Sequence, residues 1–432
     1  MIDIKLVREQ TALVAENCRR RQAEVDLEDL LRRDAERLKL KQTVEDLRAE
    51  RNKRSTGKPT AEELALLKKL SDEIKNLEEL LKEKESAVNE VLEKLPNLTH
   101  PSVPVGESDT ANQVLRQWGA PPEFNFTPRD HLALGESLDI IDVATAPAVV
   151  GARFSYLKGA GALLEFALIQ HALSLVINQV KLQEVIAKNN LAVPPTPFIP
   201  VIPPALIKEE TMAKMARLEP REERYHIPGD NLYLVGSAEH TLGPLHLDQI
   251  IPEAKLPLRY VGFSPAFRRE AGTYGKYTHG IFRVHQFDKL EFESFTVPEQ
   301  SEAEQDFLVA LQETLMQSLQ IPYRVVINCT GDMGLPDFRQ LDLEAWLPSQ
   351  NQYRETHTAD LMTDYQARRL NTKVRRRDGK TELVHMNDAT VFAIGRALIA
   401  ILENYQQADG SVMVPEVLRS YLGFDRIKPP AA

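Results

Sequence analysis

The sequence has little cysteine and no long apolar run. Its 432 residues include only Cys18 and Cys329. Two cysteines so far apart cannot form a disulfide framework or a paired-thiolate zinc site. No run of about 18 apolar residues is present, so no segment is expected to span a membrane. Residues 1–10 carry charges and lack an apolar core, which argues against a secretory signal. These absences favour a cytoplasmic protein with reduced thiols and no zinc.

The two common glycine-rich nucleotide motifs are also missing. The pattern G-x-x-x-x-G-K-[ST] does not occur, and no G-x-G-x-x-G follows a strand-like segment. Phosphate groups are therefore not expected in a P-loop or a Rossmann site. The formal charge is −10, from 53 Lys and Arg against 63 Asp and Glu. This bulk acidity argues against unspecific coating of nucleic acid, but it leaves room for a local basic patch.

Residues 27–95 contain almost no glycine or proline outside one interruption at residues 52–60. Residues 61–95 have a seam of mostly apolar positions at steps of three and four, which is typical of a coiled-coil helix. This seam is Leu67, Leu70, Ile74, Leu77, Leu81, Lys84, Val88, Val91 and Leu95. The less regular seam of residues 27–51 is Leu27, Leu31, Leu38, Leu40, Val44 and Leu47. Because Gly57 and Pro59 break the pattern between them, we predict an antiparallel helical hairpin.

Basic residues gather at the expected tip of this hairpin. They are Arg48, Arg51, Lys53, Arg54 and Lys58. Such a cluster is either an ordinary solvated turn or a contact for the phosphates of a nucleic acid. Its place at the end of a long arm favours the contact. Pro96, Pro101 and Pro104 follow as a linker, so we expect an arm at 1–105 and a globular domain at 106–432.

The globular domain is predicted to be α+β, with helices packed on a central antiparallel sheet. Helical patterns cover 159–188 and 390–406. Loops, and not crossover helices, join the strand-like runs, which favours antiparallel pairing. These runs are 231–239, 256–267, 280–295, 323–329 and 339–347. Six prolines in residues 193–204 exclude a central strand there.

Two of the predicted strands have a partly polar face, because successive side chains point to opposite faces of a strand. One face of residues 280–295 carries Arg283, His285, Phe287, Lys289 and Glu291. One face of residues 231–239 carries Tyr233, Val235, Ser237 and Glu239. A single such face is often plain solvated surface, but two in one domain favour a lined pocket. Arg396 lies among apolar residues of the last predicted helix, where a buried guanidinium needs either an internal Glu or a phosphate ligand.

Several segments resemble the bacterial type of seryl-tRNA synthetase, a class II aminoacyl-tRNA synthetase. P-A-F-R-R-E-A-G at 265–272 and G-I-F-R-V-H-Q-F-D-K-L-E at 280–291 are similar to motif 2, and A-I-G-R-A-L-I-A-I-L-E-N-Y-Q at 393–406 is similar to motif 3. T-G-D-M-G at 330–334 and D-Y-Q-A-R-R at 364–369 are also typical of the family. The resemblance covers essentially the whole chain. It implies a sheet of six or seven antiparallel strands and a homodimer, with the interface motif near Pro203 and Pro204.

The resemblance also implies the reaction and its cofactors. Serine would attack the α-phosphate of ATP to give seryl-adenylate and pyrophosphate. The 3′ end of serine tRNA would then take the seryl group, and selenocysteine tRNA is a second acceptor that the family allows. Mg²⁺ would accompany ATP. The hairpin would bind the long variable arm of the tRNA through Arg48, Arg51, Lys53, Arg54 and Lys58.

The site residues that the resemblance implies form overlapping groups. The ATP-binding residues would be Arg268, Glu270, Arg283, Val284, Phe287, Glu355, Thr358 and Arg396. Of these, Arg268 at the α-phosphate and Arg396 at the γ-phosphate would be catalytic, and Glu355 would also bind Mg²⁺. Glu270 would accept from the adenine amino group, and Phe287 would stack on the adenine ring. The serine-binding residues would be Ser237, Ala238, Glu239, Arg268, Glu291 and Thr390.

Four places depart from the family pattern. They are Ser237 in place of Thr, His279 in place of Arg, Asp388 in place of Asn, and Thr358-Ala359-Asp360 in a stretch usually rich in Ser and Cys. These departures keep a second hypothesis open, a diverged paralogue that charges a carrier protein or a modified substrate, or a non-catalytic RNA-binding or regulatory protein. The tRNA arm favours the synthetase, because paralogues that charge carriers tend to lose it. A purely structural coiled-coil protein would explain residues 27–95 only.

Overall fold

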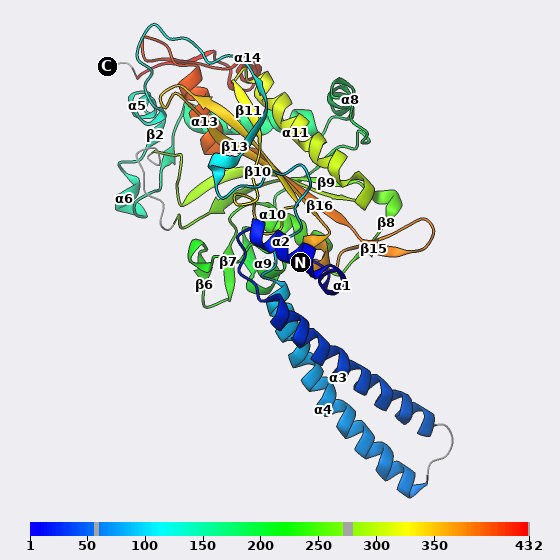
Figure 1. The fold of residues 1–432 in the computed structure, drawn as a ribbon. Helices are drawn as coiled ribbons and strands as arrows, with labels where there is room; N and C mark the ends of the chain where they lie inside the picture. The colour runs from blue at the N-terminus through cyan, green and yellow to red at the C-terminus, as the bar shows by residue number, and fades with distance from the viewer. Residues whose placement is uncertain (56–59, 271–279, 431–432) are drawn as a thin grey trace. The chain divides into compact units, whose positions relative to one another are not determined.

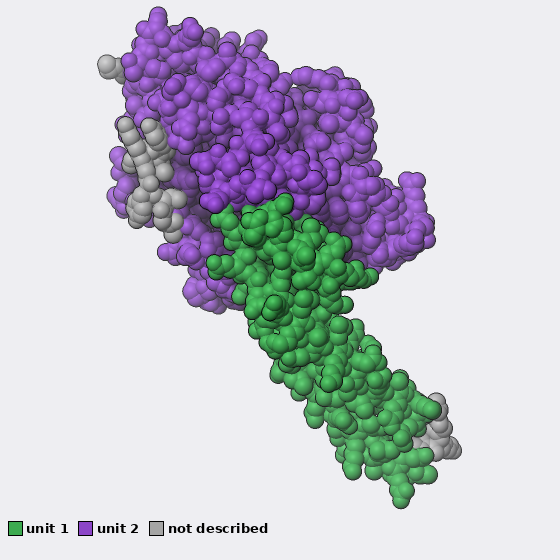
Figure 2. Space-filling model, in the orientation of Figure 1, with its two compact units in different colours: residues 1–98 green, residues 99–432 purple. Residues whose placement is uncertain are grey.

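The computed structural model describes residues 1–55, 60–270 and 280–430 of the chain. These residues form two compact units, residues 1–98 (unit 1) and residues 99–432 (unit 2), which are coloured separately in Figure 2. Gly57, Lys58, Pro59 and His279, which figured in the sequence analysis, lie outside the described residues.

Unit 1 is helical. Two short helices, α1 (Ile4–Glu9) and α2 (Thr11–Arg20), precede the long helices α3 (Leu27–Arg54) and α4 (Ala61–Leu92), which lie side by side (Figure 1). α4 begins with a capping box, in which the Thr60 hydroxyl accepts from the backbone of Glu63 and the Glu63 carboxylate accepts from the backbone of Thr60. The pairing of α3 with α4 confirms the predicted helical hairpin.

The predicted seam is buried or partly buried on both α3 and α4, with one exception on α3, where Val44 is buried as expected but Leu38 is not. Leu70, Ile74 and Val88 of α4 are buried as expected. On α3, however, the expected seam residue Leu38 is 38% exposed, while Asp34 is only 1% exposed. Arg8 and Arg37 lie 2.6 and 2.7 Å from the two Asp34 carboxylate oxygens. The prediction that Leu38 is buried was wrong. One turn earlier, Asp34 faces Arg8 of α1, and its two arginine partners offset the cost of burying an acid.

Within its described part, unit 2 is built on one large sheet of eight strands. Neighbouring strands are antiparallel except at one edge, where β4 pairs in parallel with β9. The strands, in sheet order, are β1 (Gln113–Trp118), β11 (Tyr323–Ile327), β12 (Arg339–Leu347), β13 (Gln352–Thr363), β16 (His385–Ala393), β10 (Gln286–Thr296), β9 (Leu258–Phe267) and β4 (Ile199–Val201). This arrangement confirms the α+β class and the antiparallel sheet.

Helices and short strands surround this sheet. The helices of unit 2 are α5 (His131–Ser137), α6 (Ala146–Val149), α7 (Ala160–Val176), α8 (Gln179–Lys188), α9 (Glu209–Lys214), α10 (Glu239–Leu242), α11 (Ser301–Ser318), α12 (Tyr365–Leu370), α13 (Ile394–Asn404) and α14 (Glu416–Leu422). The short strands are β2 (Ile141–Asp142), β3 (Tyr156–Leu157), β5 (Leu206–Lys208), β6 (His226–Ile227), β7 (Leu232–Leu234), β8 (Ile250–Pro252), β14 (Lys373–Arg375), β15 (Thr381–Leu383), β17 (Val412–Met413) and β18 (Arg426–Ile427).

The two faces of the sheet differ in chemistry, and β10 shows this most clearly. Leu290 and Phe292 point into the main apolar core, to which α7, α11 and α13 contribute. The alternate residues Lys289, Glu291 and Glu293 are also buried, but on the other face. At this part of β10 the sheet therefore has one mainly apolar face and one face of buried charge, and the second face positions the site.

Most of the strand predictions were right, but several boundaries were wrong. β9, β11 and β12 confirm three of the predicted runs, and Pro200 lies in the edge strand β4, where a proline is tolerated. The run at 280–295 is a strand only from Gln286 onward. The run at 231–239 is a strand only over β7, because the chain then turns into α10 at Glu239.

The helical predictions need two corrections. The pattern at 159–188 is two helices, α7 and α8, bent by 77° at a break. The predicted helix at 390–406 begins only at Ile394, because Thr390 belongs to β16. The central strands β13 and β16 were missed. Among the described residues no single helix has the length and apolar character needed to cross a membrane, and only the bent pair α7 and α8 would meet those criteria together.

Candidate active site

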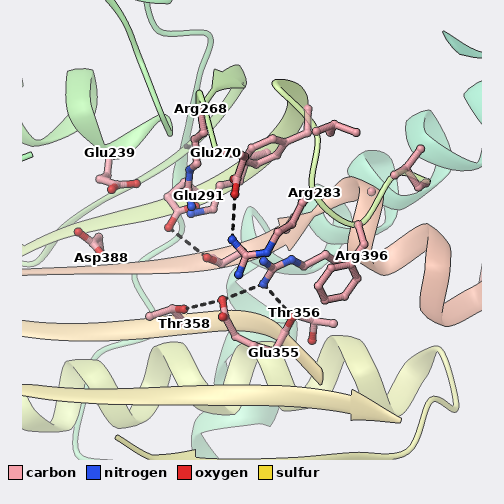
Figure 3. A pocket seen from close by; sticks show the side chains of 18 of the residues that line it. Glu239, Arg268, Glu270, Arg283, Glu291, Glu355, Thr356, Thr358, Asp388 and Arg396 are labelled. Carbon is pink, nitrogen blue, oxygen red and sulfur yellow. Dashed lines mark hydrogen bonds and ion pairs between the residues drawn. The ribbon is translucent and has the colours of Figure 1, made fainter. Parts of the chain in front are cut away.

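An open cleft lies on the charged face of the sheet (Figure 3). Its walls come from β10, β13 and β16, from the first turn of α13, and from residues 281–284, which precede β10. A cleft with convergent polar groups is typical of a small-molecule site.

All of the ATP candidates line this one cleft, although they come from separate parts of the sequence. They are Arg268, Glu270, Arg283, Val284, Phe287, Glu355, Thr358 and Arg396. Arg268 and Glu270 follow the end of β9, and Arg396 lies in the first turn of α13. The fold therefore brings together every residue of this predicted group.

Arg268 is held between backbone and an aromatic ring. Its Nε donates to the carbonyl of Gly236 at 3.2 Å, and its guanidinium carbon lies 5.4 Å from the centroid of the Phe287 ring. The neighbouring Glu270 has a φ of 49°, in the left-handed region that a non-glycine residue rarely adopts. Arg153 donates to the Glu270 carbonyl at 2.8 Å, and Arg283 pairs with its carboxylate at 2.8 Å. These contacts fix the turn after β9.

Arg396 has an internal anion as its partner. Its guanidinium lies 3.0 Å from a carboxylate oxygen of Glu355, donates to the Glu355 carbonyl at 2.9 Å, and lies 5.0 Å from the centroid of the Phe282 ring. Burial acts to raise the pKa of Glu355, but Arg396 and Arg268 outweigh it and hold that pKa below its ordinary value. An anionic Glu355 is thus one of the two partners that the sequence allowed for Arg396.

The serine candidates are divided between the cleft wall and the interior. Glu239, Glu291, Thr390 and Arg268 line the cleft. Glu291 and Thr390 face each other on neighbouring strands, and the Thr390 hydroxyl lies 3.4 Å from a Glu291 oxygen. Ser237 and Ala238 are completely buried just before α10 and do not line the cleft.

The two serine-site glutamates differ in their tendency to carry charge. Burial raises the pKa of Glu291 to about 8, although Lys289 lies only 2.8 Å from its carboxylate. Burial also acts on Glu239, but Lys289, His240 and Arg217 outweigh it and lower the pKa of Glu239 well below its ordinary value. Glu239 is therefore a fixed negative charge suited to a cation, whereas Glu291 can hold a proton and hydrogen-bond a hydroxyl.

Several residues of the cleft were missed as site residues by the sequence analysis. They are Arg217, Ile281, Phe282, Lys289, Thr356, Asp360, Asp388, Ala393 and Gly395. Lys289 could have been found, because it shares a strand face with Glu291. Asp360 and Asp388 were noted only as departures from the family pattern. Arg217 lies in no motif and no regular element, so the sequence held no signal for it.

Four of the five proposed tRNA-binding residues lie in the last turns of α3. Arg48 pairs with Glu78 of α4 at 2.7 Å, and Arg54 pairs with Glu50 at 2.8 Å. Arg51 and Lys53 share this end of the helix, and Lys58 is outside the described residues. Such exposed ion pairs are weak, so both arginines can exchange them for phosphate contacts.

The fold and cleft define a class of enzyme. Residues 223–405 match the core domain of class II tRNA synthetases (G, H, P, S and T), and an antiparallel sheet carries the site, so the chain is a class II aminoacyl-tRNA synthetase. Residues 1–99 match the seryl-tRNA synthetase N-terminal domain. Together with the full-length relatives described next, this shows that the chain belongs to the seryl-tRNA synthetase family.

The relatives match over the full length. The serine–tRNA ligase of Thermodesulfovibrio yellowstonii is 40% identical over 99% of this chain and 100% of its own length. The serine–tRNA ligase of Clavibacter michiganensis is 41% identical over 100% of this chain and 99% of its own length. The seryl-tRNA synthetase of Pyrococcus horikoshii complexed with ATP is 37% identical, has a TM-score of 0.86 and covers 100% of both chains. The structure of the cytoplasmic serine–tRNA ligase of Naegleria fowleri in complex with AMP is 31% identical and has a TM-score of 0.83. The match covers 100% of this chain and 99% of that one.

These relatives confirm the sequence-based resemblance. The activity is that of an aminoacyl-tRNA ligase specific for serine, and the hypothesis of a diverged paralogue is not favoured.

His240 is predicted to stay uncharged at the edge of the cleft. Burial lowers its pKa to about 3, even though Glu239 lies 3.6 Å away and opposes this. Histidine NMR spectra should therefore show no protonation of this ring between pH 8 and pH 5, whereas the unfolded chain should titrate near the ordinary value of about 6.5. The signal missing from His240→Gln identifies the ring. An inflection of that signal within this range would contradict the prediction.

Proposed function

We propose that the cleft performs both chemical steps of serine–tRNA ligation. In the first step a carboxylate oxygen of serine attacks the α-phosphorus of ATP, the bond to the β-phosphate breaks, and pyrophosphate leaves. In the second step a hydroxyl of the terminal tRNA ribose attacks the seryl carbonyl, and AMP leaves. The convergence of the whole ATP group and four of the serine candidates on one cleft carries this proposal.

For the first step, Arg268 would stabilise the negative charge that builds on the α-phosphate. Its position near Phe287 fits a ligand whose adenine stacks on that ring while its phosphate meets the guanidinium. Glu270 would accept from the adenine amino group. Arg396 would bind the γ-phosphate, which requires it to share or release Glu355.

Mg²⁺ is proposed to enter together with ATP. The described residues contain no cluster of three or more acids, histidines or cysteines arranged to hold a metal ion on their own. Glu355, with the Thr358 hydroxyl 3.5 Å from its carboxylate, offers the single acidic ligand that suits Mg²⁺ when phosphates and waters supply the rest. When bound, the ion would neutralise phosphate charge.

For serine, the charged Glu239 would bind the substrate ammonium. Glu291 and Thr390 would bind the hydroxyl, and Arg268 would bind the carboxylate. Ser237 and Ala238 would contribute through the backbone and by placing Glu239, because their side chains lie outside the cleft wall. A site built to hydrogen-bond a hydroxyl rejects an analogue that lacks it, since its own buried groups are then left unpaired.

We further propose a homodimer. Large apolar side chains are exposed on α7 and beside β4, the edge strand of the sheet. Phe166 is 56% exposed, and Ile202, next to Pro203 and Pro204, is 88% exposed. Exposed apolar patches of this kind mark protein interfaces, and an isologous contact would cover both copies at once.

The remaining parts of the proposal concern the tRNA and the location. Residues 1–105 would act as the tRNA arm and 106–432 as the catalytic domain, and the division of the structure after Leu98 supports a boundary in this region. Serine tRNA is the proposed acceptor, and selenocysteine tRNA is a second one on the family resemblance alone. Both cysteines are free and buried, which supports a cytoplasmic location.

Replacing Arg268 by Ala should abolish adenylate formation. Serine-dependent exchange of pyrophosphate into ATP is expected to fall by at least about 100-fold, because a preorganised donor to the transition state is lost. Arg116→Ala is the matched control. Arg116 lies on β1, at the opposite edge of the sheet from β4 and outside the cleft, and it pairs with Glu313 of α11. Both variants should keep the size of the unmodified protein in solution. Near-normal exchange in Arg268→Ala would contradict the assignment.

Neutralising Arg51, Lys53 and Arg54 with Gln should weaken tRNA charging and flatten its salt dependence, while serine-dependent exchange stays intact. Loss of each phosphate contact should reduce the slope of log tRNA affinity against log salt concentration by about one. The control removes three charges from unit 1 outside the hairpin, at Lys5, Arg19 and Arg20. An equal loss of exchange and charging in the hairpin variant would contradict the separation of the two functions.

A further inference from the structure

Arg217 lies where three acids from different elements meet. Its guanidinium is 3.1 Å from Asp388 of β16, 3.7 Å from Asp360 of β13 and 3.5 Å from Glu239 of α10. All four residues line the cleft, in which Figure 3 labels Glu239 and Asp388. Asp388 and Asp360 also face each other across neighbouring strands. One guanidinium therefore links the inner wall of the cleft to the serine-site carboxylate.

Asp388 is the main ionic partner of Arg217, because it is the nearest of the three acids, at 3.1 Å. Burial raises the pKa of Asp360 well above its ordinary value. Burial also raises the pKa of Asp388, to about 6, while Arg217 and a hydrogen bond with Asp360 oppose the rise. Burial thus favours the neutral form of Asp360, and Arg217 favours the charged form of Asp388. Asp388 stands where the family pattern has Asn, so this charge is a departure of the chain.

Glu239 keeps one oxygen open toward the ligand. Its Oε1 faces Arg217 at 3.5 Å and His240 at 3.6 Å. Its Oε2 is buried and has no partner within hydrogen-bond distance among the described residues, although the nearby Ser237 hydroxyl acts to lower the pKa of Glu239. An unpartnered buried carboxylate oxygen in a cleft wall is costly unless a ligand completes it. Arg217 competes with a cationic ligand for the Glu239 carboxylate. The closer its guanidinium lies to Glu239, the more weakly that carboxylate can bind the ligand.

We propose that Arg217 and Asp388 form a positioning pair for serine recognition, in which Asp388 holds the guanidinium away from Glu239 and leaves that carboxylate to the substrate ammonium. The proposal rests on the proposed function, in which Glu239 binds the ammonium. Neither member needs to touch serine. If Asp388 loses its charge, the nearest anion left for Arg217 is Glu239, and the arginine then competes with the substrate. If both charges are removed together, the competition disappears.

The test compares Asp388→Asn, Arg217→Gln and the double variant in serine-dependent ATP–pyrophosphate exchange, with separate KM values for serine and ATP. In Asp388→Asn the KM for serine should rise at least about tenfold, while the KM for ATP stays within about twofold. The double variant should return the KM for serine to within about threefold of the unmodified value. Arg217→Gln alone should also keep the KM for serine within about threefold of the unmodified value, because Asp388 can then take up a proton and Lys289 still lowers the pKa of Glu239.

The control for a merely structural effect is Glu304→Gln. Glu304 forms a buried ion pair with Arg259 at 2.7 Å and also accepts from Ser294, on the apolar side of the sheet. This change should lower thermal stability without a selective rise in the KM for serine. Glu304→Gln, like Asp388→Asn, replaces a buried carboxylate that pairs with an arginine by the corresponding amide. It differs from Asp388→Asn because Glu304 lies outside the cleft.

Three results would overturn the positioning pair. The first is an unchanged KM for serine in Asp388→Asn. The second is a double variant no better than Asp388→Asn. The third is a rise of tenfold or more in the KM for serine in Arg217→Gln. This measurement still tests the positioning pair if Asp388→Asn does not fold. Absence of serine-dependent exchange in the unmodified protein would instead overturn the proposed function, and the pair with it.

Discussion

The alternation of side chains along the central strands is the constraint on which the site depends. In β10, Leu290 and Phe292 point into the apolar core, so their neighbours Lys289, Glu291 and Glu293 must occupy the opposite face. Because β16 and β13 continue the sheet, Thr390 and Asp388 of β16 lie opposite Glu291 and Glu293 of β10, and Asp360 of β13 lies opposite Asp388. A face with so many buried charges is stable only if each charge is paired, protonated or completed by a ligand.

These three solutions occur at different places on the charged face. Arg396 and Glu355 are paired near the start of α13, where the proposed phosphates would bind. Burial raises the pKa of Asp360 beside Asp388 and so favours its protonated form. The open oxygen of Glu239 is left for a ligand. Arg268 joins the proposed serine and ATP positions, so one arginine can act on both reacting groups. Recognition of serine and activation by ATP thus depend on one balance of charge, which the inner pair of Arg217 and Asp388 adjusts.

Much of the fold and site could be predicted from the sequence, and the failures have physical reasons. Period-two alternation correctly placed Phe287, Lys289 and Glu291 on one strand face, and the eight ATP candidates taken from the motifs all line one cleft. Thr390 was assigned to a helix because an apolar run does not show where a buried strand ends and a helix begins. The burial of Asp34 on α3 was not predicted, because its pairing with Arg8 of α1 arises only in the folded unit. Arg217 could not be found, because only the tertiary fold brings it to Asp388.

The central claim is that the charged face of the sheet recognises serine by its ammonium and hydroxyl and activates it with ATP. Pyrophosphate exchange with serine, threonine and alanine in parallel tests this claim most directly. The structure predicts exchange with serine that exceeds exchange with alanine by at least about 1,000-fold in kcat/KM, because alanine leaves the hydroxyl-binding groups unpaired. Comparable exchange with alanine, or preferred exchange with threonine, would contradict this account of the cleft.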